Sequence, residues 1–125
     1  MIYKASILVK TTNPLNGSWG HWRGPSARRK KQRTAARTTL DAERIAQGWG
    51  AVEFPVEVHL VRVAPSNGLD DDALPASLKA IRDGITDWLG LKDDRTPDIR
   101  WTYDQRRGPQ RYYAVEVTIS PLLAT

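Results

Sequence analysis

The sequence predicts a small α+β domain whose elements follow the order strand, helix, strand, helix, strand, strand. Four segments alternate polar and apolar residues, as half-buried strands do. Two further segments begin with residues that favour helix starts, and one of them has an apolar face at helical spacing. A chain of 125 residues with 40% hydrophobic content can bury one core. We therefore expect a single domain over residues 1–125, without repeats or linkers.

The first half of the chain predicts two strands around one long helix. Residues 2–10 alternate, and the Pro, Gly and Asn residues that follow them are typical of a loop. A helix should begin at residues 25–26, because Pro suits a first turn and Ser can cap it, and should end at Gly48. Residues 52–64 are β-branched and alternating, and Pro55 indicates that this strand starts at a sheet edge.

The second half predicts one more helix and a hairpin. Residues 74–89 place Leu, Ile and Trp at helical spacing, and Asp72 stands at the N-cap position. Residues 98–105 and 111–119 alternate again, and the turn residues RRGP between them favour a β-hairpin. The tryptophans that we expect in the core are Trp49, Trp88 and Trp101.

The composition excludes several classes of protein. The chain has no cysteine, which rules out disulfides, thiol catalysis and cysteine-ligated zinc. No apolar run approaches the roughly 20 residues of a membrane span, and the N-terminal residues lack the apolar core of a signal peptide. We expect a soluble, cytoplasmic protein.

Charge is segregated along the chain, although the net charge is only +5. Residues 21–37 contain seven cationic and no acidic side chains, whereas eight of the ten aspartates lie between Asp70 and Asp98. A cationic segment can hold a polyanion, and an anionic cluster can hold a metal cation. A basic solvated helix and an acidic loop would give the same pattern without either function.

The cationic segment is a candidate surface for nucleic-acid phosphates, which are bound by positive charge spread along a surface. Trp19 and Trp22 beside it could stack on unpaired bases, although at least one of them is expected in the core. His21 lacks metal-ligand spacing. Arg107, together with Arg106 and Arg111, stands at the predicted hairpin, where a solvated turn is the alternative. The predicted DNA contacts are Arg23, Arg28, Arg29, Lys30, Lys31, Arg33 and Arg107.

Carboxylates stand at both ends of the predicted second helix, at Asp70–Asp72 and at Asp93 and Asp94. A helix of about 16 residues is some 24 Å long, so the two groups meet only if the chain folds back or if their flanking segments share a sheet. If they meet, like charges about 4 Å apart repel by roughly 4 kcal/mol at an effective dielectric near 20. Mg²⁺ or Mn²⁺ would relieve this repulsion through oxygen ligands. A capping Asp72 and a solvated acidic turn are the alternative.

The pattern of these carboxylates resembles that of RusA-type Holliday-junction resolvases, small endonucleases often encoded by phages and prophages. That family has an Asp-x-Asp-Asn-Leu segment, a Lys followed four residues later by Asp, and an Asp pair after the helix. The matching residues here are Asp70-Asp71-Asp72-Ala73-Leu74, Lys79, Asp83, Asp93 and Asp94, with RDGI at 82–85 and WTYDQ at 101–105 as in the phage branch. The resemblance covers roughly residues 55–119.

Two departures from the family pattern affect what the resemblance implies. Ala73 replaces the usual Asn, which removes a side chain that could orient a carboxylate. Lys79 follows Asp72 by seven residues, where the short form of the motif has about four, but one extra helical turn keeps Lys79 on the same face. The resemblance therefore implies an active site of the family's kind that is impaired by the loss of Asn.

The resemblance implies a small mixed sheet with two main helices and a homodimer. It also implies Mg²⁺-dependent (or Mn²⁺-dependent) hydrolysis of phosphodiesters in branched DNA, such as four-way junctions. The reaction would take place in a bacterial or phage-infected host cell. It assigns metal binding to Asp70, Asp72 and Asp94, with Asp93 and Asp83 as weaker candidates. Lys79 would stabilise developing charge on phosphate or position the water; a simple i,i+4 ion pair with Asp83 is the alternative. Two rival functions remain: a DNA-binding protein that has lost catalysis, and an interaction protein with a structural acidic cluster.

Overall fold

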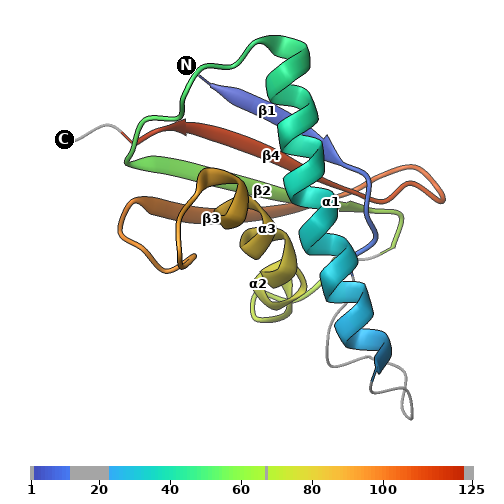
Figure 1. Cartoon of the computed structure of the whole chain (residues 1–125). Coiled ribbons are helices and arrows are strands. Elements are labelled where there is room, and N and C mark those ends of the chain that lie inside the picture. Colours follow the sequence, from blue (N-terminus) through green and yellow to red (C-terminus); the bar gives the residue numbers. More distant parts are fainter. Residues whose placement is uncertain (1, 12–22, 67, 123–125) are drawn as a thin grey trace.

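A four-stranded mixed sheet carries helices on one face, as Figure 1 shows. The structure, a computed structural model, describes residues 2–11, 23–66 and 68–122, without the side chains of residues 23–25. The elements are β1 (Tyr3–Ile7), α1 (Arg23–Gln47), β2 (Val56–Ala64), α2 (Ala73–Ser77), α3 (Lys79–Leu89), β3 (Ile99–Arg107) and β4 (Ala114–Pro121). The strand order is β1-β4-β2-β3. The predicted α+β class, with a small mixed sheet and two main helices, is confirmed.

The predicted hairpin between the last two strands is wrong, because β2 lies between them. β2 pairs in parallel with β3, with Val56 opposite Ile99, and antiparallel with β4, with Leu60 opposite Val117. Val56, Val58 and Leu60 of β2 are buried, and the backbone of such a strand needs a neighbour on each side to satisfy its hydrogen bonds. Turn residues between two strands do not specify which strand each will pair with.

Pro55 does not mark an edge strand. It directly precedes β2, and its carbonyl accepts a hydrogen bond of 3.0 Å from the Leu122 amide. Because β2 begins only at Val56, the strand keeps all of its amide donors and can occupy the centre of the sheet.

The first helix ends where predicted but begins at Arg23, before the predicted start at residues 25–26, and the second helix differs more. α1 ends at Gln47, and Gly48 follows with φ of +67°, the left-handed conformation that glycine adopts at a helix end. The predicted helix over residues 74–89 is two helices, because Leu78 departs from helical geometry with φ −103° and ψ 5°. The apolar face continues through this break, since Leu78, Ile81 and Ile85 are all fully buried.

The core lies between the sheet and the helices, and tryptophans close one end of it. Trp49 is buried against Tyr3, with ring centroids 4.9 Å apart, and Trp88 lies 6.1 Å from Trp49 in an edge-on arrangement. Trp88 and Trp101 are half-buried. In the part of the chain that the structure describes, the helices are too short or too polar to cross a membrane.

Gly84 allows α3 to pack directly against α1. A Cβ at this position would collide with the carbonyl oxygen of Arg33 and would lie 2.8 Å from the Ala36 Cβ. The two helices therefore approach each other more closely than any side chain larger than hydrogen permits. This contact fixes the distance between the basic helix and the helix that carries Lys79.

We expect Gly84→Ala to destabilise the protein by about 1–3 kcal/mol, because the overpacking exceeds the gain in helix propensity of roughly 1 kcal/mol. Urea unfolding monitored by circular dichroism would measure the free energy of unfolding. Gly50→Ala is the matched control, since a Cβ at Gly50 meets nothing within 4 Å. Equal stability of Gly84→Ala and wild type would contradict the close packing of these helices.

Candidate functional site

Asp94 is the centre of the candidate site. Its side chain is 4% exposed, and its Oδ2 lies 2.7 Å from the Lys79 Nζ and 2.9 Å from the Arg82 guanidinium. Its backbone carbonyl accepts a hydrogen bond of 2.6 Å from the Trp101 indole. A buried carboxylate is stable only when it is paired, and two cations here satisfy that requirement.

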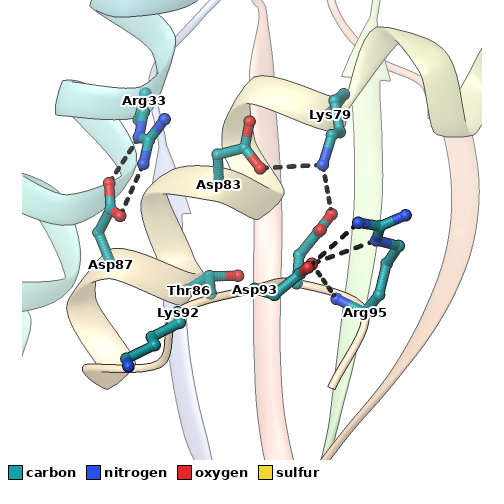
Figure 2. A pocket seen from close by; sticks show the side chains of 9 residues that line it. Arg33, Lys79, Asp83, Thr86, Asp87, Lys92, Asp93 and Arg95 are labelled. Carbon is teal, nitrogen blue, oxygen red and sulfur yellow. Dashed lines mark hydrogen bonds and ion pairs between the residues drawn. The ribbon is translucent and has the colours of Figure 1, made fainter. Parts of the chain in front are cut away.

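Lys79 joins two acidic side chains, as the dashed lines in Figure 2 show. Besides Asp94, it contacts Asp83 at 3.0 Å, one helical turn further along α3. Burial lowers the pKa of Lys79, but the hydrogen bonds to Asp94 and Asp83 outweigh it and raise the pKa above its ordinary value of 10.5. Lys79 is therefore a protonated, positively charged group at neutral pH rather than a base. The predicted pair with Asp83 is confirmed, and it coexists with the contact to Asp94.

Arg82 lies between the helix and the sheet, above two aromatic rings of β3. Its guanidinium carbon is 4.9 Å from the centre of the Trp101 ring and 5.9 Å from that of Tyr103. Burial raises the pKa of the Tyr103 phenol above its ordinary value of 10.0. Cation–π contact with the rings and the ion pair with Asp94 together hold Arg82 in place.

Gln105 fixes the segment that leads into the first acidic group. Its Oε1 accepts a bond of 2.8 Å from the Leu69 amide, and its Nε2 donates one of 2.6 Å to the Leu69 carbonyl. A Cβ on Gly68 would lie 2.8 Å from this amide group, so the close approach requires glycine. The Gln105 side chain thus satisfies the backbone amide and carbonyl of Leu69, as a neighbouring strand would. Leu69 directly precedes Asp70.

The structure gives the WTYDQ segment a role that its sequence did not predict. Trp101, Tyr103 and Gln105 alternate along β3 and point to the same face of the sheet. Each holds a different part of the candidate site: the Asp94 backbone, the Arg82 side chain and the Leu69 backbone. The alternation of large and polar side chains is the signal from which this role could have been read.

Asp70, Asp71 and Asp72 form an exposed turn before α2. Asp72 occupies the N-cap position of α2, as predicted, but its side chain makes no capping hydrogen bond. Asp70 satisfies this turn instead, because its Oδ1 accepts a bond of 2.8 Å from the Ala73 amide and its carbonyl accepts one of 3.0 Å from Leu74. Such local bonds from aspartate to nearby backbone amides order the chain before the helix begins.

The structure does not bring the two acidic groups into contact. Asp94 is anchored at Trp101 and the segment before Asp70 at Gln105, a separation along β3 of about 13 Å at strand spacing. Across residues 2–11, 23–66 and 68–122, no three acidic or histidine side chains lie close enough to share a metal ion. Lys79, Asp83 and Asp94 are brought together, and the turn at Asp70–Asp72 lies further along the sheet.

Asp93 lies next to Asp94 but is engaged by Arg95. Hydrogen bonds from the Arg95 side chain and amide lower the pKa of Asp93 to about 2. The two aspartates open onto a pocket of about 490 Å³ between α1, α3 and the segment after α3 (Figure 2). Its lining residues are Arg33, Lys79, Asp83, Thr86, Asp87, Lys92, Asp93, Asp94 and Arg95. Charges of both signs line it, as a site for a phosphate and a cation requires.

The basic side chains of α1 do not form one uniform surface. Arg28, Arg29, Lys30 and Lys31 are exposed on the N-terminal part of the helix, which extends beyond the sheet (Figure 1). Arg33 instead binds Asp87 of α3 through two hydrogen bonds of 2.6 and 2.8 Å. Arg33 therefore links the two helices, which leaves the predicted DNA contacts to the residues before it.

The remaining predicted contacts lie elsewhere or outside the described residues. Arg107 donates a hydrogen bond of 3.1 Å to the Pro65 carbonyl, and Arg106 pairs with Glu116. The predictions for Trp19, His21 and Trp22, and for the side chain of Arg23, lie outside the described part of the chain.

A comparison of the sequence with models of known protein families and with curated proteins found no match.

We expect the link between α1 and α3 to weaken in acid. Hydrogen bonds from Arg33 lower the pKa of Asp87 below its ordinary value of 3.8. A carboxyl group whose pKa falls on folding stabilises the protein at pH values above the pKa that it has in the unfolded chain. This stability is lost as the pH falls through the pKa of the folded state. Asp87→Asn should therefore reduce the free energy of unfolding at neutral pH by about 1 kcal/mol or less, because the pair is partly exposed. The difference from wild type should shrink below pH 3.8.

Urea denaturation at a series of pH values would measure this dependence. Asp41→Asn is the control, because Asp41 pairs with Arg44 only within the exposed surface of α1. A difference between Asp87→Asn and wild type that stays constant down to about pH 2 would exclude the carboxylate as its cause.

Proposed function

We propose that the protein is a metal-dependent endonuclease that hydrolyses phosphodiesters in branched DNA, as the RusA-type resolvases that its sequence resembles do. The observation that carries the proposal is the buried Asp94 carboxylate held by Lys79 beside an open, charged pocket. Strongly interacting ionisable groups in a pocket are typical of catalytic sites. Here they coincide with the residues that the resemblance selects.

The carboxylate oxygens of Asp94, Asp70 and Asp72 are the hard ligands that Mg²⁺ and Mn²⁺ prefer. A bound ion would polarise the phosphate and lower the pKa of an attacking water. Lys79 and Arg82 neutralise Asp94 through ion pairs. One ion could bind both acidic groups only if the exposed turn of Asp70 and Asp72 moved toward Asp94. The side chains, together with metal–oxygen bonds of about 2.1 Å, span only part of the distance between the two groups.

Lys79 supplies the positive charge nearest to Asp94. Its side chain is 52% exposed, so it can turn from the carboxylate to an incoming phosphate without leaving the site. A fixed cation at this place would stabilise the charge that develops on the phosphate oxygens during hydrolysis. Lys79 is therefore proposed as a catalytic residue and Arg82, which is 18% exposed, as a positioning residue for Asp94.

The basic start of α1 is proposed to hold the DNA backbone. Arg29, Lys30 and Lys31 are exposed on the N-terminal part of α1, and this part of the helix extends beyond the sheet (Figure 1), where a large polyanion can approach. The link from Arg33 to Asp87 joins this surface to the helix that carries Lys79. Because a four-way junction is two-fold symmetric, a homodimer would present one such site to each of two strands.

A second candidate function is a DNA-binding protein of this fold that has lost catalysis. Two observations favour it: Ala73 stands where the resembled family has Asn, and the described carboxylates are not grouped around one metal position. Both functions require the basic surface of α1, and only the first requires Asp94 and Lys79 to act on a phosphate.

We expect the wild-type protein to cleave a four-way DNA junction with Mg²⁺ or Mn²⁺ and not with a chelator. Asp94→Asn should lower the cleavage rate by about 100-fold or more, the upper range for groups that support a metal site, and should leave junction binding largely intact. The assay would follow labelled junction strands on denaturing gels. Asp98→Asn, an exposed carboxylate after the acidic pair, is the control.

Circular dichroism would verify that Asp94→Asn is folded, because its loss leaves Lys79 and Arg82 without their shared partner. Lys79→Gln provides a second variant at an exposed position and should also lose cleavage. Wild-type rates in both variants would contradict the assignment. Junction binding without cleavage by the wild type would favour the DNA-binding alternative.

We expect reversal of charge at Arg29, Lys30 and Lys31 to Glu to weaken DNA binding and to flatten its salt dependence. Each lost phosphate contact should reduce the slope of log affinity against log salt by about 0.9, because fewer counterions are released. Fluorescence anisotropy with a labelled junction would measure the slope. Arg44→Glu, near the opposite end of α1, is the control and should change the slope little. An unchanged slope in the triple variant would place the DNA surface elsewhere.

A further inference from the structure

A second, cationic pocket opens where β2 and β3 end, away from Asp94. It has a volume of about 220 Å³ and is lined by Arg62, Ser66, Gly68, Gln105, Arg106 and Arg107. Three of these side chains are arginines and none is acidic. The volume is several times the roughly 30 Å³ that a water molecule occupies in the liquid. An anion is therefore the kind of ligand whose charge and size this pocket suits.

Arg62 is the buried member of this pocket. It is 6% exposed, on the side of β2 that faces the core beside Leu60. Its Nε and one terminal nitrogen each donate a hydrogen bond of 3.2 Å to Thr11, to the hydroxyl and to the carbonyl. A guanidinium group has five N–H donors, so these two contacts leave part of the group for another acceptor.

No described carboxylate pairs with Arg62. Among the described residues its guanidinium donates to Thr11, both of whose accepting atoms are neutral, and burial lowers the pKa of the guanidinium. The residues that the structure does not describe contain no Asp or Glu in their sequence. A buried charge without a counter-charge is costly, and a bound anion would supply one.

The other two arginines of the pocket differ in whether a carboxylate already neutralises them. Arg106 is neutralised by Glu116 through both carboxylate oxygens. Arg107 is exposed, and its Nε donates to the neutral Pro65 carbonyl, so its positive charge has no carboxylate partner among the described residues. Ser66 adds a hydroxyl donor at the same pocket. Arg62 and Arg107 thus present two arginine charges that carboxylates do not neutralise.

We propose that this pocket binds a phosphate group, with Arg62 as its buried anchor and Arg107 and Ser66 as further donors. Arginine suits this ligand because its planar fork matches two phosphate oxygens at once. Gln105 also lines the pocket and holds Leu69 next to Asp70. A phosphate bound here would therefore lie beside the exposed acidic turn and not in the Lys79–Asp94 pocket. The inference does not require the protein to cleave DNA.

The melting temperature in phosphate and in chloride buffers of equal pH and ionic strength tests the proposal. Inorganic phosphate that binds only the folded protein should raise the wild-type melting temperature, by about 3 °C or more once it is well above its dissociation constant. Arg62→Met should abolish this rise, and Arg107→Gln, an exposed change that leaves the core intact, should weaken phosphate binding by about tenfold. Arg100→Gln, on the exposed surface of β3, should keep the full response.

Three results would overturn the proposal. They are a wild-type melting temperature that is the same in both buffers, an Arg62→Met protein that responds as the wild type does, and an Arg107→Gln protein with undiminished phosphate binding. If Arg62→Met does not fold, the comparison of wild type, Arg107→Gln and Arg100→Gln by ³¹P line broadening of inorganic phosphate decides the question.

Affinity for a short DNA duplex, measured on the same variants, distinguishes two sources of the phosphate. If Arg62→Met or Arg107→Gln loses both phosphate response and DNA affinity, and inorganic phosphate competes with DNA, the pocket holds a backbone phosphodiester. If DNA affinity is unchanged while the phosphate response is lost, the pocket holds free phosphate or a phosphomonoester. Both results support a phosphate site, and neither depends on the outcome of the junction-cleavage assay.

Discussion

The insertion of β2 between β3 and β4 is the constraint on which the other features depend. Because β3 runs parallel to β2, the chain must return from the end of one strand to the start of the next, and parallel pairing always requires such a crossover. That crossover contains the acidic turn, both short helices and the segment with Asp93 and Asp94. The pairing of β2 with β3 therefore determines that the two acidic groups lie on one face of the sheet, and also how far apart they are.

Some of the charges that are segregated in the sequence are paired in space. Arg33 from the basic segment binds Asp87 from the acidic one, and Lys79 and Arg82 neutralise Asp94. These contacts fasten α1 to α3 and α3 to the segment after it, so they contribute to the fold whatever the function is. Among the described side chains, the exposed turn at Asp70–Asp72 and the exposed Lys30 and Lys31 of α1 form no ion pair with one another's segments, and Arg62 and Arg107 bond only neutral acceptors.

The side chains of β3 connect the three regions to which we assign a role. Trp101 holds the Asp94 segment, and Gln105 holds Leu69 before the acidic turn while lining the cationic pocket. These groups lie on one regular strand, whose spacing is rigid compared with that of a loop. A phosphate at Arg62, the carboxylates at Asp70 and Asp72, and the pair of Lys79 and Asp94 would then form a series along the same face.

The sequence by itself determined local features: α1 ends at Gln47, directly before Gly48, and the apolar face of Leu78 and Ile85 is buried. Helix ends and periodicity depend on neighbouring residues, so they can be read from the sequence. It also paired Lys79 with Asp83 through their spacing on one helix, and that contact is present, whereas the contact of Lys79 with Asp94 was not predicted. Only the tertiary structure decided that β2 separates β3 from β4, since alternation is the same for any pairing partner. It likewise decided that Arg62 is buried and that Asp70 lies away from Asp94, because both depend on contacts between residues that are distant in the chain.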